Sequence, residues 1–128
     1  MMPYDYFETH SGTGVLSTCD AAGRVNAAIY ARPHVLENGK MAFLMDSRRS
    51  WKNISEHPHA HYLFKEDASG WQGRRFTLEV DSVDDSPALL EALCRRCPPV
   101  VRAGKGERHV VIFRVVDCRP LVGDGEEK

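Results

Sequence analysis

Short runs rich in β-branched and aromatic residues recur along this sequence, and each run ends in a turn signal. The clearest turn is Asn38-Gly39, the dipeptide most typical of a two-residue β-hairpin connection. About six to seven short antiparallel strands in one chain predict a closed or partly closed β-barrel. Because 128 residues is the length of one ordinary domain, we expect a single domain over residues 1–128. The predicted strands cover residues 14–18, 25–31, 35–36, 41–45, 60–65, 75–83 and 109–116.

Two short helices are predicted between the strands. The first covers residues 47–56 and ends at His57-Pro58. The second opens on Ser86-Pro87, an N-cap residue followed by a proline in the first turn, and ends at Cys97-Pro98-Pro99. We therefore expect a mainly β protein with short helices.

The charge and the apolar pattern exclude several classes of partner. A net charge of -1 gives no general reason to expect binding to nucleic acid. No apolar run approaches the roughly 20 residues that a membrane span needs. The first ten residues lack the basic region and apolar core of a secretory signal. We expect a cytoplasmic protein with neither a nucleic acid nor a membrane as partner.

Cys94 and Cys97 have the spacing of half a redox or zinc site. No second pair with this spacing exists to complete a zinc site, and Cys94 continues the apolar spacing of the predicted helix before it. We favour free, packing thiols for this pair and for Cys19 and Cys118, and we expect no metal here.

Residues 46–53, Asp-Ser-Arg-Arg-Ser-Trp-Lys-Asn, place three cations in the first turns of a predicted helix. A helix N-terminus carries partial positive charge and unpaired N–H groups, so each cation is unfavourable there by about 0.3–1 kcal/mol. Asp46 offsets only part of this. One interpretation is a solvated basic face. The other is a phosphate above the helix N-terminus, to which arginine and serine side chains donate directly.

The same region carries a family resemblance. Residues 41–58, followed by Ala60-His61-Tyr62-Leu63-Phe64, resemble the pyridoxamine 5'-phosphate oxidase-like FMN-binding split barrels. Gly14-Val15-Leu16-Ser17-Thr18 before Gly23-Arg24-Val25-Asn26-Ala27-Ala28 is similar to the hairpin that opens this family. One departure is His57-Pro58, which stands where the family has an Asn-Pro-like pair.

The resemblance implies an FMN-binding split β-barrel that works as a homodimer, with the flavin ring at the subunit interface. In that arrangement Trp71, Gly73 and Arg75 reach the ring from the partner chain. The resemblance identifies no catalytic residue. The FMN-binding positions that it implies are Arg49, Ser50 and Lys52 at the phosphate, Leu44 and Met45, whose backbone runs along the flavin, and Asn26, Ala27 and Ala28 on the second strand, which lines the ribityl chain and ring.

The function that follows is a flavin-dependent oxidoreductase or electron-transfer protein, whose electron partner is a small molecule or a redox protein. True pyridoxamine phosphate oxidases continue into a C-terminal segment with Trp, Arg and His, whereas residues 119–128 here have no such pattern. We therefore expect no vitamin B6 oxidation.

Two alternatives stay open from the sequence. His57, His59 and His61 alternate, so three imidazoles could bind a transition metal or haem iron if the segment is extended. A binding module without a cofactor, on the same fold, is the other alternative.

Overall fold

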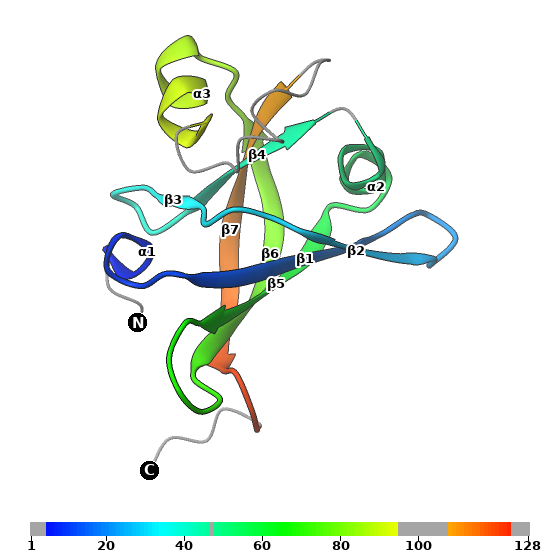
Figure 1. The fold of residues 1–128 in the computed structure, drawn as a ribbon. Coiled ribbons are helices and arrows are strands. Elements are labelled where there is room, and N and C mark those ends of the chain that lie inside the picture. The colour runs from blue at the N-terminus through cyan, green and yellow to red at the C-terminus, as the bar shows by residue number, and fades with distance from the viewer. Residues whose placement is uncertain (1–4, 47, 95–107, 124–128) are drawn as a thin grey trace.

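The computed structural model describes residues 5–46, 48–94 and 108–123 (Figure 1). The described part contains seven strands, and every pairing between them is antiparallel. The mainly β split barrel predicted from the sequence is thereby confirmed. The strands are β1 (Gly12–Cys19), β2 (Val25–Ile29), β3 (His34–Val35), β4 (Met41–Asp46), β5 (His59–Glu66), β6 (Gly73–Val83) and β7 (Arg108–Pro120).

The seven strands form one open sheet in the order β2-β1-β5-β6-β7-β4-β3. In Figure 1, β1 and β2 run across the direction of β6 and β7, so the sheet bends strongly as it wraps around its core. Two register shifts in the β6–β7 ladder, after Thr77 and after Val80, accompany this bend. The end strands β2 and β3 remain unpaired with one another, which leaves the barrel split.

Aromatic side chains fill the inside of the bent sheet. Burial alternates along β1 and β5, as expected for strands with one face on a core. The helix α1 (Tyr6–Thr9), which the sequence did not predict, adds two more buried rings at one end of the barrel. The largest fully buried side chains include Tyr62, Phe7, Phe43, Phe64, Phe76 and Phe113.

The helix α2 (Arg49–Glu56) follows β4 and packs on the open sheet through Ser50, Asn53 and Ile54. Inside this contact, Asn53 Nδ2 donates to Thr18 Oγ1 at 3.0 Å, and both side chains are buried. On the helix's other flank, Trp51 stacks on His109 of β7, with ring centroids 3.8 Å apart and planes 8° from parallel. These contacts fix where the basic start of α2 lies.

The helix α3 (Pro87–Cys94) covers a second apolar cluster on the far side of the sheet. Its Leu93 packs with Ala42, Val110 and Ile112. The expected helix end at Cys97-Pro98-Pro99 and the side chains of the Cys94–Cys97 pair lie outside the described residues. Cys19 and Cys118 are free thiols. Within the described residues, no helix is both long enough and apolar enough to cross a membrane.

Candidate functional site

The start of α2 carries positive charge that the rest of the described chain does not compensate. The helix begins directly after Arg48, whose side chain makes no capping hydrogen bond, and its first turn holds no acidic residue. The side chains of Arg48 and Arg49 have no hydrogen-bond or ion-pair partner among the described residues, and both residues are exposed. The nearby Asp46 carboxylate instead faces Arg108, at 3.4 Å. A helix N-terminus with two unpartnered guanidinium groups is suited to an anion.

A hollow of about 780 Å³ opens beside this helix start. Its walls come from the chain just before β1 and the beginning of β1, from β2 and the chain after it, from the end of β4, from the chain just before α2 and the start of α2, with one residue each from α3 and from the chain after β5. It is lined by Ser11, Gly12, Thr13, Gly14, Asn26, Ala28, Ile29, Tyr30, Ala31, Arg32, Leu44, Asp46, Arg48, Arg49, Ser50, Asp67 and Leu93. We call it the main hollow.

Five of the eight binding residues expected from the sequence meet in the main hollow: Asn26, Ala28, Leu44, Arg49 and Ser50.

The other three expected residues lie elsewhere. Ala27 is exposed, on the opposite face of β2 from Asn26 and Ala28, because successive side chains of a strand alternate. Met45 alternates in the same way and is fully buried in the core. Lys52 lines a second hollow, described below.

The sequence analysis missed Tyr30, which continues the alternation of Asn26 and Ala28 into the main hollow. Burial raises the pKa of the Tyr30 phenol, and the nearby Asp46 carboxylate raises it further, while a hydrogen bond with Ser50 partly opposes both. Tyr30 therefore stays a neutral hydroxyl at physiological pH. The alternation along β2 was a signal for it, but its closeness to Ser50 depends on the fold.

Gly14 allows the Tyr62 side chain to pack directly against the backbone of β1 beside the main hollow. A side chain on Gly14 would collide with the Tyr62 phenol, whose hydroxyl donates to the Tyr30 carbonyl at 3.1 Å. The Tyr30 N–H in turn donates to the Gly14 carbonyl at 3.0 Å. The backbone itself thus forms this part of the hollow's surface.

A second hollow, of about 640 Å³, shares Asn26, Arg48 and Arg49 with the main hollow. The two hollows therefore adjoin at the start of α2. The second one lies between the β1–β2 hairpin and the helix, and its remaining lining residues are Asp20, Arg24, Val25, Trp51, Lys52 and Asn53.

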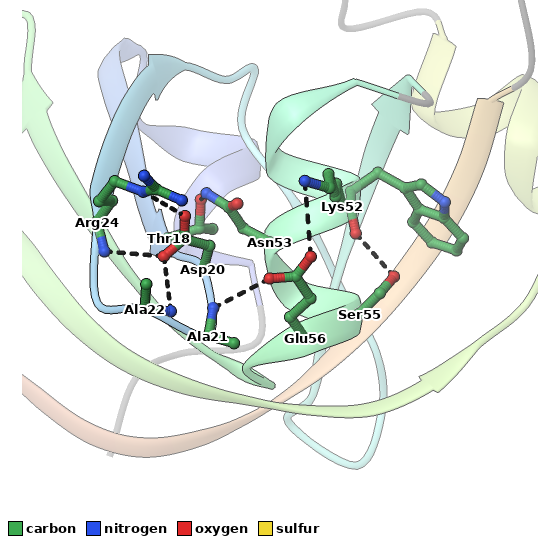
Figure 2. Close-up of polar contacts among 10 residues, drawn as sticks. Thr18, Asp20, Ala21, Ala22, Arg24, Lys52, Asn53, Ser55 and Glu56 are labelled. Atoms are coloured by element: carbon green, nitrogen blue, oxygen red, sulfur yellow. Dashed lines mark hydrogen bonds and ion pairs between the residues drawn. The ribbon is translucent and has the colours of Figure 1, made fainter.

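Hydrogen bonds hold the hairpin against the helix beside this second hollow (Figure 2). The Ala21 N–H donates to Glu56 Oε1 at 3.0 Å, in addition to the buried bond between Asn53 and Thr18. Arg24 pairs with Asp20 at 2.9 Å, and Lys52 pairs with Glu56 at 3.7 Å.

The alternating histidines do not form a three-imidazole metal site. The His57 and His59 rings lie 5.0 Å apart, edge to face, and His59 faces Glu79 at 3.9 Å. Among the described residues, no group of three or more His, Cys, Asp or Glu side chains is placed to hold a metal ion. Within that part of the chain, the metal alternative raised by the sequence therefore has no supporting geometry.

Comparison with known proteins places the fold. No family model matches the sequence, and no curated protein matches it. Among solved structures, an FMN-binding protein from Syntrophomonas wolfei subsp. wolfei aligns with a TM-score of 0.73 at 14% identity, covering 93% of this chain and 83% of that one. Group A Streptococcus HupZ aligns with a TM-score of 0.72 at 17% identity, covering 100% of both chains.

A pyridoxamine 5'-phosphate oxidase-like protein from Listeria innocua aligns with a TM-score of 0.61 at 16% identity, covering 90% of this chain and 91% of that one. The chain has the pyridoxamine 5'-phosphate oxidase-like split-barrel fold. Structural similarity at identities of 14–17% establishes the fold alone.

Proposed function

We propose that the protein is an FMN-binding flavoprotein that serves as an oxidoreductase or electron-transfer protein. The observation that carries this proposal is the main hollow ending at two unpartnered arginines on a helix N-terminus. A terminal phosphate placed there would remove the unfavourable charge of that helix start and accept bonds from Arg49 and Ser50.

The residues present fit FMN in size and in chemistry. A hollow of about 780 Å³ is within the range of small-molecule sites, roughly 300–1,000 Å³. The small side chain of Ala28 leaves room for a flat ring to approach the backbone, and Leu44 offers apolar surface. When bound, FMN would supply the transfer of a hydride or of single electrons.

Each side chain then has a distinct task. Arg49 can hold two phosphate oxygens at once, and the Ser50 hydroxyl can donate to the phosphate. Lys52, expected from the sequence as a third phosphate contact, lines only the second hollow and pairs with Glu56 at 3.7 Å, so we assign the FMN phosphate to Arg49 and Ser50 alone. Tyr30 stays protonated beside Ser50, so it can donate a hydrogen bond in the hollow.

The second part of the proposal is a homodimer that covers the flavin ring. Val15 lies directly between Ile29 and Leu63 in the β2-β1-β5 ladder, so the three side chains form one outward apolar row. Ile29 is 68% exposed and also lines the main hollow. A second copy on this row would bury it together with the ring, and Trp71, 74% exposed on the β5–β6 loop, is available to reach the partner's ring.

The test is a calorimetric titration of the purified protein with FMN and with riboflavin. We expect FMN to bind at least about tenfold more tightly, because charge-assisted bonds to a phosphate are strong. Equal affinity for the two flavins would contradict the phosphate site. NADH and NADPH are then added to the FMN-loaded protein, and bleaching of the visible flavin band identifies a direct electron donor.

A further inference from the structure

The second hollow is much larger than one phosphate group requires. Its volume of about 640 Å³ falls in the range of small-molecule sites. Among its nine lining residues, it shares only Asn26, Arg48 and Arg49 with the main hollow. A phosphate bound at the start of α2 would thus leave most of the second hollow free.

Positive charge dominates the lining of the second hollow. It contains four cationic side chains and one acidic one, the four being Arg24, Arg48, Arg49 and Lys52. The single acid, Asp20, is already engaged. Its carboxylate accepts the backbone N–H groups of Ala22 and Arg24 at 2.9 Å each, and these bonds, with the Arg24 guanidinium, hold the pKa of Asp20 below its usual range.

The two outer cations are available to a ligand. Arg24 and Lys52 are 84% and 75% exposed, and their ion pairs with Asp20 and Glu56 are surface pairs of little stability. In Figure 2, Arg24 comes from the hairpin and Lys52 from α2, with the Asn53 side chain between them. The two cations therefore lie on different walls of the second hollow.

Hydrogen bonds and a ring stack hold the walls of the second hollow in place. The Ala21–Glu56 bond and the buried Asn53–Thr18 bond attach the hairpin to α2. Trp51 is held by its stack on His109. Val25, 76% exposed, gives apolar surface on the hairpin side, so the hollow offers both cations and apolar contacts.

We infer that the second hollow binds a 5'-nucleotide, with its phosphate between Arg24 and Lys52 and its base against Val25. The inference rests on the proposed function, because it assigns the phosphate of FMN to Arg49 and Ser50. The nucleotide has two sources with the same chemistry. It is either the adenylate half of a flavin dinucleotide or a separate nucleotide that lies beside bound FMN.

The experiment measures binding of 5'-AMP, of adenosine, and of FMN and FAD by calorimetry. The variants are the wild type, Arg24→Ala, and Arg114→Ala as a matched control. Arg114 is also an exposed arginine paired with acids, but it lies on β7 and lines neither hollow. Arg24→Ala keeps the backbone bond of residue 24 to Asp20, so the hairpin turn is preserved.

We expect 5'-AMP to bind FMN-loaded wild type at least about tenfold more tightly than adenosine, and Arg24→Ala to remove most of that difference. Arg114→Ala should bind as the wild type does. If FAD binds at least about tenfold more tightly than FMN, and only while Arg24 is present, the nucleotide is the flavin's own adenylate.

Two results would overturn the inference. One is 5'-AMP and FAD affinities that are the same in wild type and Arg24→Ala. The other is loss of FMN affinity in Arg24→Ala without any 5'-AMP binding, because the second hollow would then be part of the FMN phosphate site. Absence of FMN binding in the wild type is a separate result, which contradicts the proposed function itself.

Discussion

At the scale of single residues, Arg49 is the side chain on which the proposed phosphate site most depends. Its side chain lies in the first turn of α2, where the helix dipole opposes a cation, and it has no partner among the described residues. A cation that destabilises the ligand-free helix is expected to interact favourably with a phosphate when the ligand binds.

We predict that Arg49→Ala weakens FMN binding at least about tenfold while leaving the ligand-free protein as stable or about 0.3–1 kcal/mol more stable. Removing a cation from a helix N-terminus relieves an unfavourable charge. Urea unfolding without ligand and calorimetric FMN titration measure the two effects. Arg114→Ala is the control and should retain FMN affinity. A ligand-free Arg49→Ala protein that unfolds markedly earlier would show a structural role instead.

Sequence reasoning found Arg49 and Ser50 because an excess of cations over a helix start is a local signal. It could not find the hydrogen bond between Tyr30 and Ser50, since these residues come from different elements that only the folded sheet brings together. At Met45 the strand was predicted correctly, and its alternation turns the side chain into the core. The expected contact of Met45 with the flavin through its backbone stays a prediction.

At the scale of elements, the contact between α2 and the β1–β2 hairpin sets the geometry of both hollows. The contact contains one fully buried polar pair, Asn53 with Thr18. A buried donor or acceptor that loses its partner costs about 1–3 kcal/mol, so this pair specifies the position of the helix as well as stabilising it.

We predict that Asn53→Ala and Thr18→Val each destabilise the protein by about 1–3 kcal/mol. The double variant should lose less than the sum of the two, because neither unpaired group then remains. Urea unfolding of the four proteins gives the coupling energy. Ser55→Ala removes only the exposed bond of Ser55 to the Trp51 carbonyl and should change stability by less than about 0.5 kcal/mol. Strict additivity of the two buried changes would be inconsistent with the pair.

Most elements were predictable from the sequence because alternation and turn chemistry act locally. The Asn38-Gly39 dipeptide lies in a hairpin turn as expected, but the connection is not the two-residue one: residues 37–39 form the loop, the Gly39 N–H donates to the Leu36 carbonyl at 2.8 Å, and only Gly39 has a positive φ, 84°. The helix α1 was missed because four residues carry too little periodicity to be recognised. The second hollow was missed as well, because a hairpin and a helix about thirty residues apart in sequence form it together.

At the scale of the whole molecule, the apolar row of Val15, Ile29 and Leu63 borders the main hollow and links flavin binding to assembly. An apolar ring that only one subunit covers would remain largely wet and forfeit burial of about 25 cal/mol per Å². A ligand that contacts both subunits favours the associated state by mass action.

We predict that FMN makes the dimer more resistant to dilution. Sedimentation velocity at decreasing protein concentration, with and without FMN, measures this. Ile29→Asp should shift the protein to monomer and weaken FMN binding, whereas Val83→Asp, an exposed valine at the end of β6, should do neither. A monomer that holds FMN with undiminished affinity would contradict the shared site.

The strand order has a consequence for the nascent chain during synthesis. β4 leads directly into α2, yet it joins the rest of the sheet only through β7, because its other neighbour is the short end strand β3. Residues 108–120 must therefore leave the ribosome before β4 can dock. Until then Leu44 and Asp46 of β4 are not held in the wall of the main hollow, and we expect tight cofactor loading to follow completion of β7.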